Sequence, residues 1–465
     1  MNYLRRPRSF YGRLFRLALP LILQNLITTS LGFVDTFMVG LLGQEELSAV
    51  TAANSPIFLV QVVIFGLISG LTVLVSQYWG KGDMDAVNRA MGVALYAGVS
   101  IATLVALALL LFPEGVMGLV TNNQRLIVLG APYVRIVGVS YIFNAASSVY
   151  VGMQRSTENP GMGLTVFAIS MCLNTCLNYI LIFGKFGAPA LGVTGAAAAT
   201  LASRVVEFLI TAGYAVRCRR VPLRPKALFR PGREMVGSFI KYSAPVLLNE
   251  SLWGLGTTVM VSALGHMAVS TDILAAHAIM GNVDKFATVA CFGIAGASAV
   301  IVGKTIGEGA SQEEVYSLSW CLLLVSIGIG LCVSLGLALA LPFFFIPYLF
   351  PLFHLQSLAM EIAVKMCLVH IFTMPLRAFD ITNITGILRA GGDARMAAVI
   401  DIVPLWLIAV PLTALSGLVL AAPLLLVCIS LQAETFCKPF WGTWRLRSRK
   451  WINDITLESG GGKSL

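Results

Sequence analysis

Long apolar runs recur along the whole chain, and short stretches that carry most of the charged residues separate them. Each run holds about 20 to 30 residues, and a helix rises about 1.5 Å per residue, so each can cross roughly 30 Å of hydrocarbon. The pattern therefore predicts an all-α membrane protein. The predicted spans are 13–38, 53–79, 88–112, 128–152, 162–184, 190–216, 240–264, 275–303, 314–340, 358–388, 395–416 and 420–441.

The first of these runs is echoed in the second half of the chain. Residues 18–40 read ALPLILQNLITTSLGFVDTFMVG and residues 244–265 read APVLLNESLWGLGTTVMVSALG, with a proline near the start and a closing glycine in both. GMQRSTENPGM at 152–162 and GILRAGGDARM at 386–396 share glycine, arginine and methionine at a constant offset of 234. Six is an even number of spans, so both halves start on the same side and the repeats are parallel.

The basic segment RCRRVPLRPKALFRPGREMVGSFIK divides the two repeats. We expect two pseudo-symmetric six-helix bundles, with this segment as the linker between them. The expected organisation is an N-lobe at 1–216, a cytoplasmic linker at 217–241, a C-lobe at 242–443 and a cytoplasmic tail at 444–465.

Composition excludes a soluble protein, because 57% of the residues are hydrophobic and only 12% are charged. The net charge of +10 is uneven along the chain. With the N-terminus inside, the cytoplasmic segments hold nearly all of the Lys and Arg outside the spans, and the outer loops hold only Arg125 and Lys185. We therefore expect both termini in the cytoplasm. The basic excess then faces anionic lipid and needs no nucleic-acid partner.

Each of the two repeated segments contains one acid. Asp35 lies near the end of the first, and Glu250 lies five residues after the proline of the second, where the first has Asn25. A carboxylate inside an apolar span is costly and by default marks an ion or substrate path. The two acids stand at opposite ends of matched segments, about 15 Å apart in depth. We expect Glu250 to serve cargo binding from the cytoplasm and Asp35 to serve ion loading from outside.

Other charges also fall inside the predicted spans. Asp284 could bind an ion or the cargo, or could pair with an arginine of another span. Arg204 and Glu207 are three residues apart and predict a local ion pair, and Arg377 and Glu434 are expected to extend toward the cytoplasmic surface. These charges include Arg135, Arg204, Glu207, Asp284, Lys285, Arg377, Asp401 and Glu434.

Four motifs resemble those of the multidrug and toxic compound extrusion (MATE) transporters. They are VDTFMVGLLGQEELSAV after Pro20, the loop QYWGKGD, LNTCLNYILIFG in the span 162–184, and ILRAGGD after the span 358–388. The resemblance covers residues 12–443. It implies two six-helix bundles enclosing a central cavity. It also implies export of cationic or amphipathic compounds in exchange for Na⁺ or H⁺.

The resemblance also implies the site residues. Asp35 and Asn174 match an N-lobe site that takes the coupling ion, and they would be Na⁺ ligands in a sodium-coupled protein. Asn178 stands where several members carry a second aspartate, so this chain has one charge fewer there. Glu250 and Asp380 are the C-lobe candidates for ion coupling.

For the cargo we expect contacts with Asp35, Glu250 and Asp284. We expect no cofactor besides the coupling ion, and no catalytic residue. The expected form is a multi-pass, monomeric protein of the inner cell membrane whose partners are small cationic or amphipathic molecules and membrane lipid.

Two alternatives remain open at this point. A flippase of lipid-linked sugars would share the architecture, but it would need several inward cations for a pyrophosphate group, and here the candidates are mainly acidic, although Arg135 and Arg204 could face inward. An intramembrane aspartyl enzyme would need a close carboxylate pair. The nearest such motif, AGGD ending at Asp393, falls in a loop, and the sequence has no HExxH or GxSxG.

Overall fold

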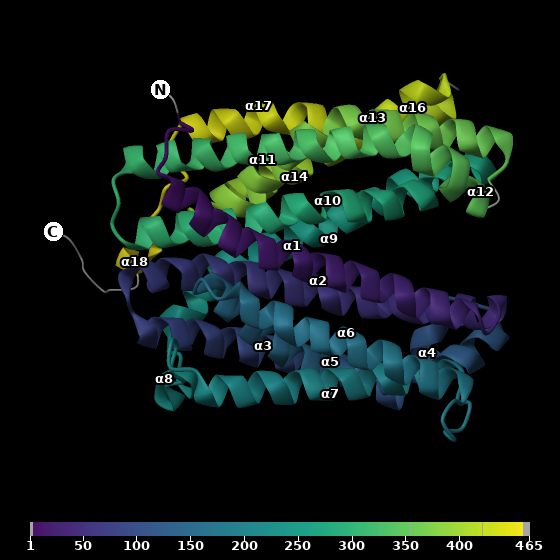
Figure 1. Ribbon diagram of the computed structural model, residues 1–465, viewed down its shortest axis with the longest axis horizontal. Coiled ribbons are helices and arrows are strands. Elements are labelled where there is room, and N and C mark those ends of the chain that lie inside the picture. Colours follow the sequence, from purple (N-terminus) through teal and green to yellow (C-terminus); the bar gives the residue numbers. More distant parts are fainter. Residues whose placement is uncertain (1–2, 354, 421, 459–465) are drawn as a thin grey trace. The chain divides into compact units, whose positions relative to one another are not determined.

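The computed structural model describes residues 3–353, 355–420 and 422–458, and every regular element within them is helical. The chain divides into two compact units. We call Leu23–Leu247, with a short piece that begins at Thr456, the N-terminal unit. The C-terminal unit consists of the residues up to Ile22 together with Leu248–Ile455. The helices of both units are labelled in Figure 1.

The N-terminal unit is built from helices α2 to α8, together with α1 from Leu23 onward and α9 up to Leu247. Within it, α5 packs against α2, α3 and α7, and α6 packs against α7. The helices are α1 (Arg8–Gly40), α2 (Gln44–Lys81), α3 (Met84–Leu111), α4 (Pro113–Gly118), α5 (Gln124–Ser156), α6 (Pro160–Phe183), α7 (Val193–Arg217), α8 (Pro225–Phe229) and α9 (Arg233–Gly265).

The C-terminal unit is built around α13, which packs against α10 and α11 as Figure 1 shows. Several of its helices are interrupted by wider π-helical turns, a common feature of functional sites. Its elements are α10 (Ser270–Gly307), α11 (Gln312–Ala340), η1 (Leu341–Leu349), α12 (Phe350–Leu352), α13 (Ser357–Ile381), η2 (Thr382–Leu388), α14 (Ala394–Pro404), η3 (Leu405–Ala409), α15 (Val410–Ala414), η4 (Leu415–Val419), α16 (Leu424–Ser430) and α17 (Ala433–Arg447). The division of the chain falls after the first residue of the last helix, α18 (Ile455–Glu458).

Ten of the described helices are long and apolar enough to cross a membrane. The two remaining predicted spans correspond to α9 and to α16 with α17. Helix α9 has the length, at 33 residues, but the run Asn249-Glu250-Ser251 makes its middle more polar. The last span is divided at residues 431–432 and carries Glu434 and Lys438. The protein is thus an all-α membrane protein with the predicted twelve-helix, two-bundle layout.

Helices α1 and α9 each belong to both units. The division falls after Ile22 in α1 and after Leu247 in α9, in each case two residues beyond the proline inside the helix, Pro20 or Pro245. The first turns of α1 therefore belong to the C-terminal unit and the first turns of α9 to the N-terminal unit. The repeat seen in the sequence is thus matched by an exchange of equivalent half-helices.

Glycines make room for the exchanged half-helices. A Cβ on Gly293 of α10 would meet the side chain of Ile22 and lie 3.0 Å from its backbone nitrogen. In the other unit, a Cβ on Gly70 of α2 would lie 2.8 Å from Cβ of Ser243 on α9. Both distances are shorter than side chains tolerate, so each close approach depends on glycine.

Candidate functional site

Asp35 lies near the end of α1 beside two asparagines of α6. Asn174 and Asn178 are four residues apart, so both side chains lie on one face of α6. The Nδ2 atom of Asn178 donates to Oδ1 of Asp35 at 2.6 Å and to Oδ1 of Asn174 at 3.0 Å. Nδ2 of Asn174 lies 3.5 Å from Oγ1 of Thr200 on α7. Three candidates from the sequence, Asp35, Asn174 and Asn178, therefore form one cluster, which we call the Asp35 cluster together with Thr200.

The Asp35 cluster presents oxygen atoms in a nearly closed environment. Asn174 and Asn178 are 2% and 1% exposed, and Oδ1 of Asn178 is buried without a hydrogen-bond partner among the described residues. Carboxylate, amide and hydroxyl oxygens are the ligands that hard cations prefer. A proton on Asp35 would also fit, because it would supply a donor near these acceptors. The cluster thus suits either coupling ion.

Asp35 has no ion-pair partner among the residues that the structure describes. The neighbouring guanidinium, that of Arg204, is committed to Glu207: its Nη1 lies 2.7 Å from Oε2 of Glu207. The same Glu207 oxygen accepts from Ser170 at 3.0 Å. The predicted local pair of Arg204 and Glu207 is confirmed, and it leaves the carboxylate of Asp35 bonded to an amide alone.

In the C-terminal unit, Glu250 is paired with an arginine that lies far away in sequence. Nη2 of Arg389, which follows η2, lies 3.0 Å from Oε1 of Glu250. The Arg389 side chain is only 3% exposed. Arg389 is therefore buried inside the unit, where its charge is compensated by an acid of α9.

Next to Glu250, a lysine joins two further acids. Nδ2 of Asn249 donates to Oδ2 of Asp401 at 2.9 Å. Nζ of Lys438 lies 2.7 Å from Oδ1 of Asp401 and 2.9 Å from Oε2 of Glu434. Glu434 was expected to extend toward the surface, and this expectation was wrong, because the side chains of Lys438 and Glu434 are 7% and 15% exposed and bond each other.

Asp380 and Asp284 have different surroundings. Asp380, on α13, is 6% exposed, and its Oδ2 has no hydrogen-bond partner among the described residues. Asp284, on α10, accepts hydrogen bonds from Nη1 and Nη2 of Arg377, with Nη2 to Oδ2 at 3.0 Å. His370 Nε2 lies 3.4 Å from Asp284 Oδ1. Of the interpretations open for Asp284, the pair with an arginine of another helix is the one present, and Arg377 does not extend to the surface.

Four residues of these clusters escaped the sequence analysis as site candidates: Thr200, Asn249, Arg389 and Lys438. Only Lys438 gave a local signal, since it stands one helical turn after Glu434. The other contacts join residues that are far apart in sequence, and hydropathy windows do not detect them.

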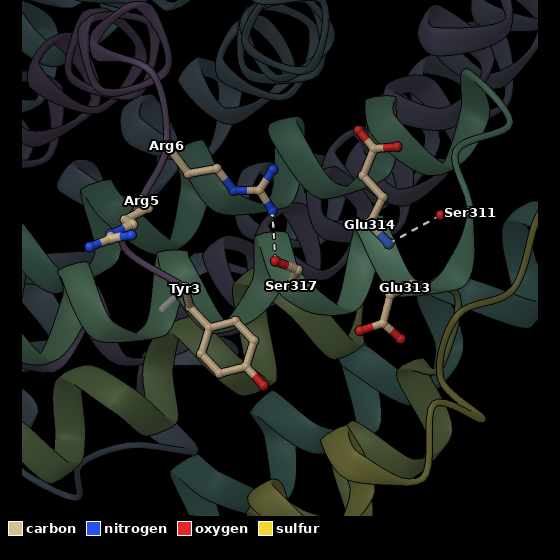
Figure 2. A pocket seen from close by; sticks show the side chains of 7 residues that line it. All are labelled: Tyr3, Arg5, Arg6, Ser311, Glu313, Glu314 and Ser317. Carbon is tan, nitrogen blue, oxygen red and sulfur yellow. Dashed lines mark hydrogen bonds between the residues drawn. The ribbon is translucent and has the colours of Figure 1, made fainter. Parts of the chain in front are cut away.

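The described residues also form two hollows. An apolar hollow of about 400 Å³ in the N-terminal unit is lined by residues of α1 and α6, among them Met38, Thr175 and Tyr179. A polar hollow of about 450 Å³ lies where the N-terminal segment meets the start of α11. Figure 2 shows Arg6 donating to Ser317 there, at 3.0 Å, with Glu313 and Glu314 across the hollow.

Known proteins resemble the chain over almost its whole length. The chain is 26% identical over 424 residues to a probable multidrug resistance protein NorM of Thermotoga maritima, which covers 88% of this chain and 87% of that protein. It is 25% identical over 433 residues to the multidrug resistance protein MdtK of Edwardsiella ictaluri, covering 88% and 87%.

Solved structures share the fold. An outward-facing multidrug resistance MATE family transporter of the MOP superfamily matches with a TM-score of 0.84 at 18% identity, over 94% of this chain and 96% of that one. A MATE transporter of Vibrio cholerae matches with a TM-score of 0.84 at 19% identity, over 96% and 99%. The MatE family model matches residues 20–180 and 245–415, one block in each repeat. This multi-pass membrane protein therefore belongs to the MatE family, the MATE transporters.

Proposed function

We propose that the protein is a secondary active multidrug efflux transporter that exports cationic or amphipathic compounds in exchange for Na⁺ or H⁺. The observation that carries this proposal is the contrast between Asp35 and three acids of the C-terminal unit. Glu250, Asp284 and Asp401 each have a basic partner within 3.0 Å. Asp35 is held by an amide at 2.6 Å and has no ion-pair partner among the described residues. Asp35 therefore has a negative charge available for a transported cation.

Two further features support this function. The apolar hollow of about 400 Å³ lies on α1 and α6, the helices that carry Asp35, Asn174 and Asn178. An apolar hollow near a carboxylate suits an amphipathic cation, which needs apolar contact and charge compensation together. The relatives named above are described as multidrug resistance proteins.

The proposed cycle is alternating access, with the ion and the cargo favouring opposite states of the protein. In this cycle the ion loads at Asp35, with Asn174 and Thr200 as further oxygen ligands in the case of Na⁺. Asn178 positions the carboxylate. Entry of one monovalent ion yields about 2.3 kcal/mol per 100 mV, and export of one monovalent cation costs the same. One-for-one exchange is thus driven by the ion's concentration gradient alone.

We also propose that the protein lies in the inner cell membrane with both termini in the cytoplasm and that it works as a monomer. The eight Lys and Arg residues of 217–241 support this orientation, because such segments stay on the cytoplasmic side.

The arginines favour this proposal over transport of an anionic lipid-linked sugar. Arg204 is paired with Glu207 at 2.7 Å, and Arg135 lies 3.8 Å from Glu114. Arg204 is thus committed to Glu207 and is not left over for a pyrophosphate group.

The test is export of ethidium by the purified protein in liposomes, with a Na⁺ gradient and a proton gradient imposed in turn. We expect ethidium to accumulate against its own gradient under one of the two ions. Equal ethidium distributions with and without either gradient, in vesicles that contain folded protein, would refute antiport.

A further inference from the structure

Two carboxylates of the C-terminal unit, those of Asp401 and Glu434, are bridged by the ammonium group of Lys438. Lys438 and Glu434 lie one turn apart on α17, and Asp401 lies on α14. The ammonium of Lys438 contacts both acids, at 2.7 Å and 2.9 Å, and the Lys438 side chain is 7% exposed. The positive charge therefore lies among the carboxylates and away from water.

Both carboxylate oxygens of Asp401 already contact a donor. Oδ1 contacts Lys438, and Oδ2 accepts from Nδ2 of Asn249 at 2.9 Å. Glu250, next to Asn249, is paired with Arg389 at 3.0 Å. A Na⁺ ion at this place would have to compete with two donors for the same oxygens.

The fixed charge adds repulsion to this competition. A lysine ammonium is a compact point charge with three donors, and it lies where a bound monovalent cation would sit. Two like charges a few ångströms apart repel strongly in a protein interior, because the surroundings screen them poorly. Asp35 differs, since its partner Asn178 is neutral and leaves one amide oxygen free.

We propose that Lys438 determines ion specificity: its ammonium is the resident cation of the Asp401–Glu434 pair and excludes Na⁺ from these two acids. This inference deepens the proposed antiport and rests on it for its meaning in transport, since it removes this pair as a Na⁺ coupling site. A proton is a different case, because it needs only one oxygen, and Oδ2 of Asp380 lacks a partner among the described residues.

The test reads Na⁺ binding directly, in the absence of any cargo. The midpoint of thermal unfolding is measured for purified protein in NaCl and in KCl of equal concentration, since a ligand that binds the folded state raises this midpoint. All variants carry Asp35→Asn, so that the Asp35 cluster cannot contribute a carboxylate. Failure of the export test would leave this measurement intact, so the two proposals fail separately.

In the Asp35→Asn protein, which keeps Lys438, we expect the same midpoint in both salts. A Na⁺-specific rise that Asp401→Asn then abolishes would overturn the proposal, because it would place Na⁺ on the acids that Lys438 holds. This arm requires no change at Lys438, so it does not depend on the folding of a lysine variant.

The second arm removes the resident cation. Lys438→Met keeps an unbranched side chain, one atom shorter, and deletes its charge, so the two acids should now bind Na⁺ and the midpoint should rise by about 2 °C or more in NaCl relative to KCl. Asp401→Asn should cancel this rise. The control is Lys365→Met, the same substitution at the more exposed Glu361–Lys365 pair, where we expect no difference between the salts. A folded Lys438→Met protein that does not distinguish Na⁺ from K⁺ would refute the proposal.

Discussion

The pair of Glu250 and Arg389 makes a sharp prediction about stability. The Arg389 side chain is 3% exposed, and its Nη1 has no hydrogen-bond partner among the described residues. Replacing Glu250 by Gln removes the charge that Nη2 contacts at 3.0 Å and leaves the buried guanidinium without its carboxylate. Breaking a buried pair from one side costs about 3–5 kcal/mol. Because the Glu250 side chain is 24% exposed, we expect the lower end, a loss of about 3 kcal/mol in the free energy of unfolding.

The measurement is a double-mutant cycle on purified protein, with unfolding followed by tryptophan fluorescence. Glu250→Gln and Arg389→Met are made singly and together, and the double variant should be more stable than the sum of the single losses predicts. The control is Glu361→Gln, which breaks the more exposed i,i+4 pair with Lys365 and should cost about 0.5 kcal/mol or less.

Two results would refute this reasoning. One is a loss for Glu250→Gln that does not exceed the loss for Glu361→Gln. The other is an additive double variant, which would show that the two side chains do not act on each other.

Three other outcomes are expected. Asp35→Asn should reduce gradient-driven ethidium export to the level of empty vesicles while the protein stays folded, and export at the wild-type rate would remove Asp35 from the mechanism. Gly293→Ala should lower stability by about 1–3 kcal/mol through its clash with Ile22, whereas Gly281→Ala in the same helix, with open space around it, should be neutral or stabilising; equal thermal midpoints for the two variants would contradict the close approach. A cysteine at position 238 (Ser238→Cys), in a cysteine-free background, should resist an impermeant thiol reagent added to intact cells, and rapid labelling would reverse the topology.

The sequence predicts the fold well, because membrane-spanning helices can be recognised from the length and hydropathy of their segments. The repeat of 18–40 at 244–265 also anticipated the correspondence of α1 and α9. It did not reveal that each of these helices changes unit two residues after its proline. Which bundle a half-helix joins depends on close approaches such as that of Gly293 to Ile22, and hydropathy does not record them.

The candidate site was predictable in part. The resemblance implied a site made by Asp35 on one segment and by Asn174 and Asn178 on another. In the structure, Asn178 is hydrogen-bonded to both Asp35 and Asn174. The charge partners in the C-terminal unit were not predictable. A basic residue near the end of an apolar run looks the same in sequence whether it points to water or turns inward to an acid, as Lys438 and Arg389 do. Only the packing of the helices decides between these cases.

Glu250 illustrates the consequence for function. As a lone acid in an apolar run it was expected to hold cargo from the cytoplasmic side, with a larger effect on cargo binding than Asp35. With Arg389 at 3.0 Å its charge is compensated inside the unit. We therefore propose Asp35, before Glu250, as the coupling residue. Measuring cargo affinity in folded Glu250→Gln protein separates a direct contact between Glu250 and the cargo from a loss of protein stability.

The most direct test of Asp35 as the coupling carboxylate is a linkage measurement at equilibrium. Ethidium affinity is measured by fluorescence for wild type and Asp35→Asn protein, while Na⁺ and pH are varied in turn without any gradient. Antiport requires the ion and the cargo to oppose each other, so wild-type affinity should fall as the coupling ion is added. In Asp35→Asn the affinity should no longer respond to that ion. A wild-type affinity that is indifferent to both Na⁺ and pH, or an Asp35→Asn protein that responds as wild type does, would contradict the assignment.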